Sequence, residues 1–307
     1  MRDLISGKRA DIIKTTNFQK RKRIAVTVFT SLNETNSEQN NAVLTAKLKQ
    51  LQTILTGWGR AAVAFSGGVD STFLLKAAHD CLGDNVIALT AVSCTLPKRE
   101  RKEAQNFCQR EGVRQILCDP HEMEVEGFRN NPPDRCYHCK HSTFSLFRTV
   151  AAKEGIAIVA DGSNADDVGD YRPGMRAAAE LGIQSPLRDA GLTKADIRAL
   201  SRQWGLSVWD KPSAACLASR VAYGEAITEE KMNRIDQAET FLQDLGFRQV
   251  RLRVHGDLAR IETVPDAFAP LLSHREEITA KCKALGFSYV TMDLTGYRTG
   301  SMNESLT

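Results

Sequence analysis

Apolar runs alternate with amphipathic stretches over the first two thirds of the chain. The run at 86–92 is largely β-branched and apolar throughout, which is typical of a strand buried on both faces. Strands are predicted in this way at 61–65, 86–92, 113–118 and 156–160. Helical spacing of apolar residues predicts helices at 43–58, 70–82, 98–111 and 137–153. This alternation favours an α/β fold, with a parallel sheet covered by helices on both faces.

The pattern changes after about residue 225. Strand 247–255 alternates apolar and polar positions, and Gly256-Asp257 connects it to strand 258–264 as a tight hairpin. Helices 228–245 and 267–285 and a strand 287–294 complete an α-β-β-α-β order, typical of a small α+β domain. We therefore predict three parts: a basic, flexible N-terminal arm and linker (1–42), an α/β domain (43–225) and a C-terminal α+β domain for substrate binding or oligomerisation (226–307).

Composition narrows the class of protein. A chain of 307 residues with 42% apolar and 25% charged residues is typical of a soluble globular protein. No apolar run approaches the roughly 20 residues that span a bilayer, and the N-terminus lacks the apolar core of a secretion signal. We expect a cytoplasmic protein without membrane contact, in which the eight cysteines form no disulfide framework.

The positive net charge is concentrated at one end of the chain. Residues 1–23 hold eight Lys or Arg and two Asp, a net charge of +6, so the total of +4 leaves about −2 on the remainder. The folded body is therefore not expected to bind nucleic acid. The basic arm is predicted to be a solvated extension, and contact of the arm with nucleic acid or a membrane is the alternative.

The segment 61-AAVAFSGGVDSTFLLKAAHDCLG-83 places Ser66, Gly67, Gly68, Asp70 and Ser71 between a strand and a helix. Adjacent glycines let the backbone approach a ligand, and the helix N-terminus directs free N–H groups at the same point. The serine hydroxyls can donate to phosphate oxygens, and the aspartate can hold Mg²⁺. We interpret the segment as an anion site rather than a capped strand–helix turn. It fits neither the Walker pattern nor the dinucleotide fingerprint.

S-G-G-x-D-S directly after a strand resembles the PP-loop of the ATP pyrophosphatases. Members of that group split ATP between the α and β phosphates. The resemblance implies an adenine nucleotide α-hydrolase-like fold, ATP and Mg²⁺ as cofactors, and an adenylylated substrate with pyrophosphate as products. It leaves the acceptor open.

A second polar segment, DGSNADDVGDYRPG, follows strand 156–160 and contains Asp161, Asn164 and Asp167. The carboxyl ends of parallel strands meet at one edge of a sheet, where ligands bind. We therefore expect this loop to form a rim of the same cleft and to contact ribose, Mg²⁺ or pyrophosphate. The alternative is a plain polar loop.

Three of the cysteines have distinctive surroundings. Cys136 and Cys139 form a C-x-x-C, a spacing that serves zinc, thiol exchange or an iron–sulfur cluster. No second pair with metal-ligand spacing is evident, so the motif alone does not choose among them. Cys216 lies among small residues in the segment DKPSAACLASR, with Lys211 and Arg220 on either side, which favours a reactive thiolate. A buried structural cysteine is the alternative.

Five segments, in order from about residue 45 to the end of the chain, resemble the LarE family: SGGVDS, PPDRCYHCK, DGSNADDVGDYRPG, KPSAACLASR and DLTGYRTGSMNE. LarE proteins are ATP-dependent sulfur transferases of nickel-pincer nucleotide synthesis. The resemblance implies that a carboxylate of pyridinium biscarboxylate mononucleotide is adenylylated and converted to a thiocarboxylate. We also expect a homo-oligomer that hands its product to a nickel-inserting enzyme. The basic arm is not part of the family core.

The sulfur source follows from the cysteine pattern of the family. Some members sacrifice a cysteine sulfur, whereas members with three cysteines are thought to use a 4Fe–4S cluster that carries an extra sulfide. Because the chain resembles the second pattern, Cys136, Cys139 and Cys216 are expected to hold three irons and leave the fourth open. Sacrificial transfer from Cys216 is the alternative, but it leaves the other two cysteines without a role.

Arginines of the C-terminal part are candidates for binding the substrate phosphate. Arg251 and Arg253 lie two apart on one face of a predicted strand, and a planar guanidinium matches phosphate oxygens. We expect them, with Arg220, to hold the mononucleotide phosphate, and Glu239 and Glu262 to orient them or line the same cleft. The alternative is a salt-bridged strand surface.

Other functions share parts of these patterns. A tRNA thiolase would use the same phosphate loop and cysteines, although the slightly acidic body does not favour it. An amidotransferase-type synthetase would need a further domain that this length does not accommodate. A nucleotide sensor would bind ATP without releasing pyrophosphate.

Overall fold

The computed structural model describes residues 41–167, 173–212 and 215–306. The chain divides into two compact units, Met1–Gln50 and Leu51–Thr307, and the second unit holds both sheets and all of the candidate site residues. A helix covers residues 41–58. Residues 1–40 of the predicted arm and linker lie outside the described residues. The domain boundaries at 42 and 225 stay predictions.

The larger sheet has four parallel strands in the order β3-β2-β1-β4, which confirms the predicted α/β class. They are β1 (Ala61–Ala64), β2 (Val86–Ala91), β3 (Arg114–Cys118) and β4 (Val159–Ala160). The apolar strand β2 is buried over five of its six residues, as predicted, whereas Cys118 is the one fully buried residue of the edge strand β3. The strand predicted at 156–160 is too long, because ladder pairing of β4 with β1 is limited to Val159 and Ala160.

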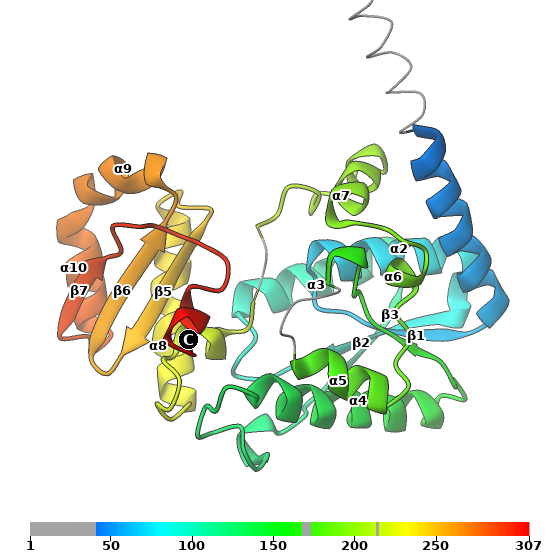
Figure 1. Cartoon of the computed structure of the whole chain (residues 1–307), viewed down its shortest axis with the longest axis horizontal. Helices are drawn as coiled ribbons and strands as arrows, with labels where there is room; N and C mark the ends of the chain where they lie inside the picture. Colours follow the sequence, from blue (N-terminus) through cyan, green and yellow to red (C-terminus); the bar gives the residue numbers. More distant parts are fainter. Residues whose placement is uncertain (1–40, 168–172, 213–214, 307) are drawn as a thin grey trace, which may run out of the picture. The chain divides into compact units, whose positions relative to one another are not determined.

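Helices cover both faces of this sheet. Figure 1 shows α4 and α5 on one face and α2 and α3 on the other. The helices are α2 (Val69–Leu82), α3 (Lys98–Glu111), α4 (Arg135–Lys153) and α5 (Pro173–Glu180). Ile87 and Leu89 of β2 pack with Phe144 and Phe147 of α4 in one buried cluster, because alternate strand residues point to the same face. This packing holds the strand ends, and the loops that follow them, in place.

The segment between β4 and the second sheet contains helices that apolar periodicity did not predict. They are α6 (Pro186–Asp189) and α7 (Lys194–Gln203), with α5 before them. Helix α7 begins with a capping box, in which Thr193 Oγ1 accepts from the N–H of Asp196 and the Asp196 carboxylate accepts from the N–H of Thr193. The 3₁₀ turns are Gly83–Asn85, Glu122–Glu124, Ala165–Asp167, Leu217–Arg220, Pro265–Ala267 and Ser301–Leu306.

The second sheet has the order β5-β6-β7 and the predicted α-β-β-α-β succession. Its elements are α8 (Glu229–Asp244), β5 (Val250–His255), β6 (Leu258–Thr263), α9 (Phe268–Ser273), α10 (Arg275–Ala284) and β7 (Tyr289–Met292). The predicted hairpin is confirmed: β5 and β6 are antiparallel, and Gly256 between them has φ 58°. The single helix predicted at 267–285 is wrong, because the chain leaves helical geometry at His274 and α10 starts anew at Arg275.

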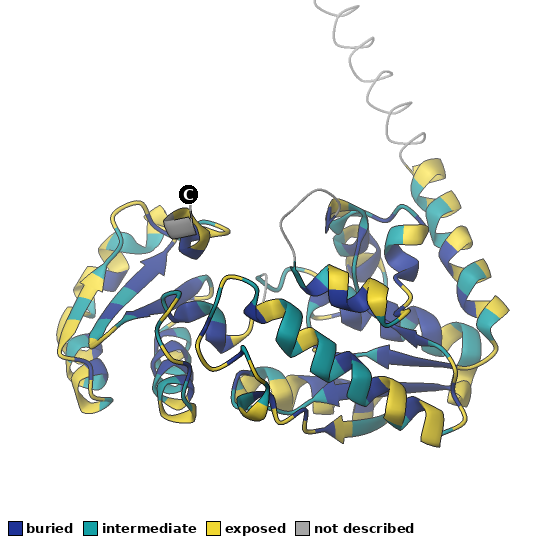
Figure 2. Cartoon of the chain, turned by 60° about the horizontal axis from the view of Figure 1, so that its bottom comes forward, coloured by how far each residue is buried: buried dark blue, intermediate teal, exposed yellow. Residues whose placement is uncertain are grey.

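The interior follows the strands of both sheets, which are mostly buried in Figure 2. One core cluster joins α8 to the hairpin through Ile235, Leu242, Leu252 and Ile261. Within the described ranges, no helix combines the length and apolar character that a membrane span needs.

Candidate active site

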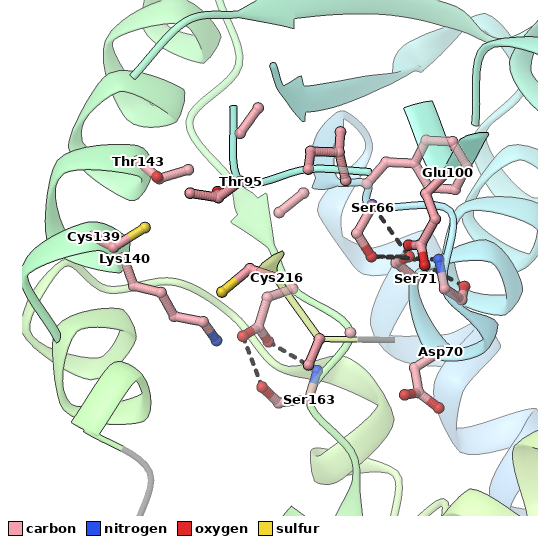
Figure 3. A pocket seen from close by; sticks show the side chains of 18 of the residues that line it. Ser66, Asp70, Ser71, Thr95, Glu100, Cys139, Lys140, Thr143, Ser163 and Cys216 are labelled. Atoms are coloured by element: carbon pink, nitrogen blue, oxygen red, sulfur yellow. Dashed lines mark hydrogen bonds between the residues drawn. The ribbon is translucent and has the colours of Figure 1, made fainter. Parts of the chain in front are cut away.

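A pocket of about 650 Å³ opens at the carboxyl edge of the parallel sheet (Figure 3). The segments that follow β1, β2, β3 and β4 all contribute to its walls, and α4 and the segment before Leu217 complete them. This is the edge where ligands bind in parallel sheets. The structure therefore places the predicted phosphate loop, the acidic loop and two of the three chemically distinctive cysteines in one cavity.

The phosphate loop has the geometry that its glycines predict. Gly67 has φ 75°, a backbone conformation that residues with a Cβ rarely adopt. A Cβ at this position would also lie 3.1 Å from Cβ of Ala104 in α3, so both the conformation and the space disfavour a side chain. The Oγ atoms of Ser66 and Ser71 are 3.0 Å apart, and Ser71 Oγ also donates to the carbonyl of Gly68. All these residues except Gly67 and Ala104 line the pocket. The loop thus presents hydroxyls and the N-terminus of α2 to a bound anion.

The acidic loop lies directly against the phosphate loop. A Cβ at Gly162 would come within 2.9 Å of the backbone nitrogen of Ser71, so only glycine permits this approach. Asp161 accepts from the hydroxyls of Ser163 (2.7 Å) and Ser185 (2.8 Å).

Asn164 and Asp167 are held by each other, since the N–H of Asn164 donates to the Asp167 carboxylate at 2.9 Å. Asp161, Asn164 and Asp167 all line the pocket. The loop is thus held by its own hydrogen bonds and by one from Ser185.

Asp70 pairs with a lysine that is distant in sequence. Lys194 Nζ lies 2.6 Å from Asp70 Oδ2. Burial raises the pKa of Asp70 and the ammonium group opposes this effect. Oδ1 of Asp70 is buried and has no hydrogen-bond donor among the described residues. A carboxylate oxygen without a donor at the phosphate loop fits a Mg²⁺ ligand, since Mg²⁺ is commonly held by one or two carboxylates and substrate phosphates.

Cys216 is exposed and is held by backbone contacts on both sides. The N–H of Leu217 donates to the carbonyl of Thr95 at 2.8 Å. Arg220 Nη1 donates to the carbonyls of Ala215 (2.6 Å) and Cys216 (3.0 Å). These contacts fix the loop at the pocket wall and leave the thiol free for chemistry.

Lys211 does not lie among the pocket residues with Cys216 but contacts the phosphate loop from outside the pocket. Its Nζ donates to the carbonyl of Gly67 at 3.2 Å and pairs with Glu103 at 2.9 Å. The cysteine segment is therefore tied to the phosphate loop by one lysine. Residues 213 and 214, between Lys211 and Cys216, and residues 168–172 of the acidic loop lie outside the described residues.

Cys136 and Cys139 occupy the first turns of α4, which begins two residues earlier than predicted. Figure 3 shows Cys139 and Cys216 on facing walls with their sulfur atoms turned into the pocket. Burial raises the pKa of the Cys139 thiol to about 12, and the neighbouring Cys216 adds to this rise. Burial and Cys216 likewise raise the pKa of Cys136, although that residue does not line the pocket. The three sulfurs are therefore electrostatic neighbours.

The predicted phosphate-binding arginines lie outside the pocket and are largely buried. Arg220 forms two hydrogen bonds of 2.9 Å with Glu239. Arg253 pairs with Glu262 at 2.9 Å. Burial lowers the pKa of Arg251, and the charge of Arg220 lowers it further. The structure brings the five residues together as a buried ionic network beside the Cys216 segment.

Two pocket carboxylates were missed by the sequence patterns. Glu100, in the first turn of α3, lies beside Ser66 and Ser71 in Figure 3, and burial raises its pKa against the opposing charge of Lys211. Glu122 is 2% exposed and accepts from Thr95 Oγ1 at 3.3 Å. Each follows a predicted strand at its carboxyl end, and that position is the signal that could have identified both.

Comparison with known proteins gives the family. No family model matches the chain. An uncharacterized protein of Synechocystis is 42% identical over 267 residues, which cover 86% of this chain and 100% of that protein. The pyridinium-3,5-bisthiocarboxylic acid mononucleotide synthase of Lactiplantibacillus plantarum is 39% identical over 267 residues, 87% of this chain and 94% of that enzyme. The chain belongs to the LarE family.

A weaker similarity supports the fold class of this LarE protein. A subunit of the glutamine-hydrolysing GMP synthase of Methanocaldococcus jannaschii is 25% identical over 200 residues, 60% of this chain and 63% of that protein. GMP synthetases belong to the PP-loop group, and the four-stranded parallel sheet agrees with this placement. The predicted fold and the predicted family are both confirmed.

The three thiols of this LarE protein can be compared with the donors that a 4Fe–4S cluster would need. Among the described residues, no three His, Cys, Asp or Glu side chains are grouped closely enough to hold one metal ion. A 4Fe–4S cluster makes a different demand, because each cysteine binds its own iron and the sulfurs stand further apart. Three free thiols, two of them in the pocket wall, match the donor type and number of such a site.

Breaking the buried ion pair of Arg220 and Glu239 on one side only is expected to destabilise the protein strongly. Both side chains are at most 5% exposed, and Glu239 also accepts from the N–H of Leu252 at 2.9 Å. Arg220→Met leaves a buried carboxylate without its cation, which costs about 3–5 kcal/mol of unfolding free energy. The double variant with Glu239→Leu should recover most of this loss. Urea unfolding measures the free energy of unfolding of both variants. A single variant as stable as the wild type would contradict the prediction.

The stability that this ion pair contributes should depend on pH in a definite direction. Burial alone raises the pKa of Glu239, but Arg220 outweighs it and the net pKa is lowered. Stability from a lowered carboxyl pKa is present above the unfolded value of about 4.3 and is lost as the pH falls through the folded value. The wild type should therefore lose stability relative to the double variant, which lacks this carboxyl, below about pH 4.

Proposed function

We propose that this protein is an ATP-dependent sulfur transferase that converts a carboxylate of pyridinium biscarboxylate mononucleotide to a thiocarboxylate, for nickel-pincer nucleotide synthesis. The observation that carries the proposal is the presence of the phosphate loop and Cys216 in the walls of one pocket. Activation and sulfur delivery then occur in the same space. The Lactiplantibacillus plantarum relative is a synthase of the bisthiocarboxylic acid mononucleotide, which supports this substrate.

The chemistry proceeds in two displacements. A carboxylate oxygen attacks the α-phosphorus of ATP, the bond from that phosphorus to the bridging oxygen breaks, and pyrophosphate leaves with the electron pair. The acyl adenylate is a good electrophile, so a sulfur nucleophile displaces AMP from its carbonyl carbon. Two rounds give the bisthiocarboxylate.

The pocket residues divide between these steps. Ser66, Gly68 and Ser71 bind the phosphates together with Gly67, whose positive φ shapes the loop. Asp161, Asn164 and Asp167 bind the ribose or the leaving pyrophosphate. Asp70 would hold Mg²⁺, which supplies charge neutralisation to the phosphates when bound.

We further propose that the arginine network binds the phosphate of the mononucleotide. Arg251 belongs to this network, and burial together with the charge of Arg220 lowers its pKa, an effect that a bound phosphate would oppose. Its guanidinium lies 5.5 Å from the ring centre of Tyr297. Arg220 and Arg253 hold their carboxylate partners and the backbone of Ser219 and Cys216, which fixes the network next to the cysteine.

For the sulfur source we propose a 4Fe–4S cluster on Cys136, Cys139 and Cys216. When bound, the cluster would supply sulfide through the iron that no cysteine occupies. Protein purified without oxygen should be brown and should contain about four irons per chain. With added sulfide it should complete several turnovers with its mass unchanged. Colourless protein that turns over once and loses the mass of hydrogen sulfide would instead show sacrifice of Cys216.

The remaining features complete the proposal. We propose a cytoplasmic homo-oligomer that passes its product to a nickel-inserting enzyme. A tRNA thiolase is the second candidate class, but the described pocket residues carry six carboxylates and two lysines, which disfavours an RNA backbone. The six carboxylates are those of Asp70, Glu100, Glu122, Asp161, Asp166 and Asp167.

Exchange of labelled pyrophosphate into ATP tests the proposal. The first displacement is reversible, so exchange should require the pyridinium substrate and should not be stimulated by tRNA. Exchange that needs tRNA would favour the thiolase. Absence of exchange with either acceptor, although ATP is bound, would favour a nucleotide sensor.

A further inference from the structure

A second cavity, of about 510 Å³, shares the phosphate loop with the candidate active site. Gly67 and Thr72 line this second cavity, whereas Ser66 and Gly68 line the active-site pocket. Its other walls come from α3, from residues 207–212 and from the end of α8 with the segment after it. We propose that the second cavity is an anion site that takes a compact polyphosphate, such as inorganic pyrophosphate, and weakens ATP binding through Lys211. The effect on ATP rests on the proposed function, whereas the anion site itself does not.

The charge of the second cavity favours an anion. Its described lining residues carry four cationic side chains and two carboxylates: those of Arg99, Arg110, Lys211 and Arg248, and those of Glu103 and Asp210. The active-site pocket has the opposite balance, with two lysines and six carboxylates. Coulomb attraction therefore draws a polyphosphate anion to the second cavity.

Two arginines of this cavity have partners that a phosphate can replace. Arg248 pairs with Asp210 at 2.9 Å, and its side chain is 69% exposed. Arg99 donates to Gln243 Oε1 at 3.0 Å and pairs with Asp244, again with both charged side chains at the surface. Exposed ion pairs contribute little to stability, so exchanging a carboxylate for a phosphate costs little. A planar guanidinium can then form two parallel hydrogen bonds with phosphate oxygens.

Thr72 adds a hydroxyl that no other described residue uses. The residue is 1% exposed, follows Ser71 in α2 and lines the second cavity. Its Oγ1 has no hydrogen-bond partner among the described residues. A buried hydroxyl without a partner costs free energy, which a bound phosphate oxygen would recover. This hydroxyl distinguishes the cavity from an ordinary cleft between charged surfaces.

Lys211 connects the second cavity to the phosphate loop. Its Nζ donates to the carbonyl of Gly67 at 3.2 Å and pairs with Glu103 at 2.9 Å. A polyphosphate offers this ammonium a stronger partner than a neutral carbonyl. Loss of the hydrogen bond would loosen the loop at the glycine whose positive φ shapes it, and the added negative charge would repel the phosphates of ATP. ATP should therefore dissociate faster when the second site is filled.

Calorimetric titration with inorganic pyrophosphate tests the site in the full chain. The protein is first saturated with Mg²⁺ and a non-hydrolysable ATP analogue, so that the active-site pocket is occupied. The wild type should bind one pyrophosphate per chain, and the double variant Arg99→Met with Arg248→Met should bind it at least about tenfold more weakly. Thr72→Val keeps the shape of the side chain and should weaken binding about fivefold.

Arg148→Met is the matched control for the loss of an arginine. Arg148 is exposed on α4 and lines neither cavity, so this variant should bind pyrophosphate like the wild type. Thermal unfolding shows whether each variant is folded. Absence of pyrophosphate binding to the wild type, or equal binding by the folded double variant, would overturn the second site.

The dissociation rate of a fluorescent ATP analogue tests the connection through Lys211. The bound analogue is chased with excess ATP, with or without pyrophosphate. Simple competition leaves this rate unchanged, whereas a filled second site should raise it about fivefold in the wild type and not in the double variant. An unchanged rate in the wild type would overturn the effect on ATP. Protein that binds pyrophosphate through the two arginines but binds no ATP analogue would overturn the proposed function and leave the anion site standing.

Discussion

Cys216→Ala is expected to abolish thiocarboxylate formation, by about 10³-fold or more, while pyrophosphate release continues. In the proposed reaction the thiol acts after activation, and its side chain is exposed at the pocket wall and accepts no structural hydrogen bond that the described residues show. Thiocarboxylate is measured by mass spectrometry, and pyrophosphate by an enzyme-coupled assay. Cys81→Ala, on α2 and away from the pocket lining, is the matched control and should retain both activities.

Two results of these assays would contradict the prediction. Loss of both steps in a folded Cys216→Ala protein would assign the residue a structural role. Normal thiocarboxylate formation in the variant would remove Cys216 from the sulfur path altogether.

Asp70→Ala should lower pyrophosphate release by about 10³-fold, because the metal ion and the phosphates lose their shared anchor. The variant also leaves the Lys194 ammonium without this carboxylate, so it removes one charge at the phosphate loop and unpairs another. Asp80→Ala removes a carboxylate from the same helix, where Asp80 pairs with Lys76 on the surface, and should change the rate little. Unimpaired ATP cleavage in Asp70→Ala would contradict the PP-loop assignment.

The parallel sheet and the phosphate loop could be predicted because their signals are local. The apolar run 86–92 indicates a buried strand, and Gly67-Gly68 before an amphipathic stretch indicates an anion loop. The same strand order also places the acidic loop correctly, since Asp161 directly follows β4. These inferences need only neighbouring residues and the rule that parallel strands end at a common edge.

The other parts of the fold and of the candidate site depend on contacts that sequence spacing does not encode. Lys194 and Asp70 are 124 positions apart, and no local pattern shows that they meet. The arginine pattern on β5 shows that Arg251 and Arg253 share a face, but not that the face is buried against Glu239 and Glu262. The break at His274 interrupts a continuous helical pattern through local backbone geometry.

The central claim is that ATP cleavage drives the replacement of carboxylate oxygen by sulfur in one pocket. Full-length protein is incubated without oxygen with ATP, Mg²⁺, sulfide and pyridinium biscarboxylate mononucleotide, and the products are followed by mass spectrometry together with AMP and pyrophosphate. The account predicts one AMP and one pyrophosphate for each oxygen replaced by sulfur. Thiocarboxylate formed without ATP, or AMP and pyrophosphate formed with no gain of sulfur in the pyridinium compound, would contradict it.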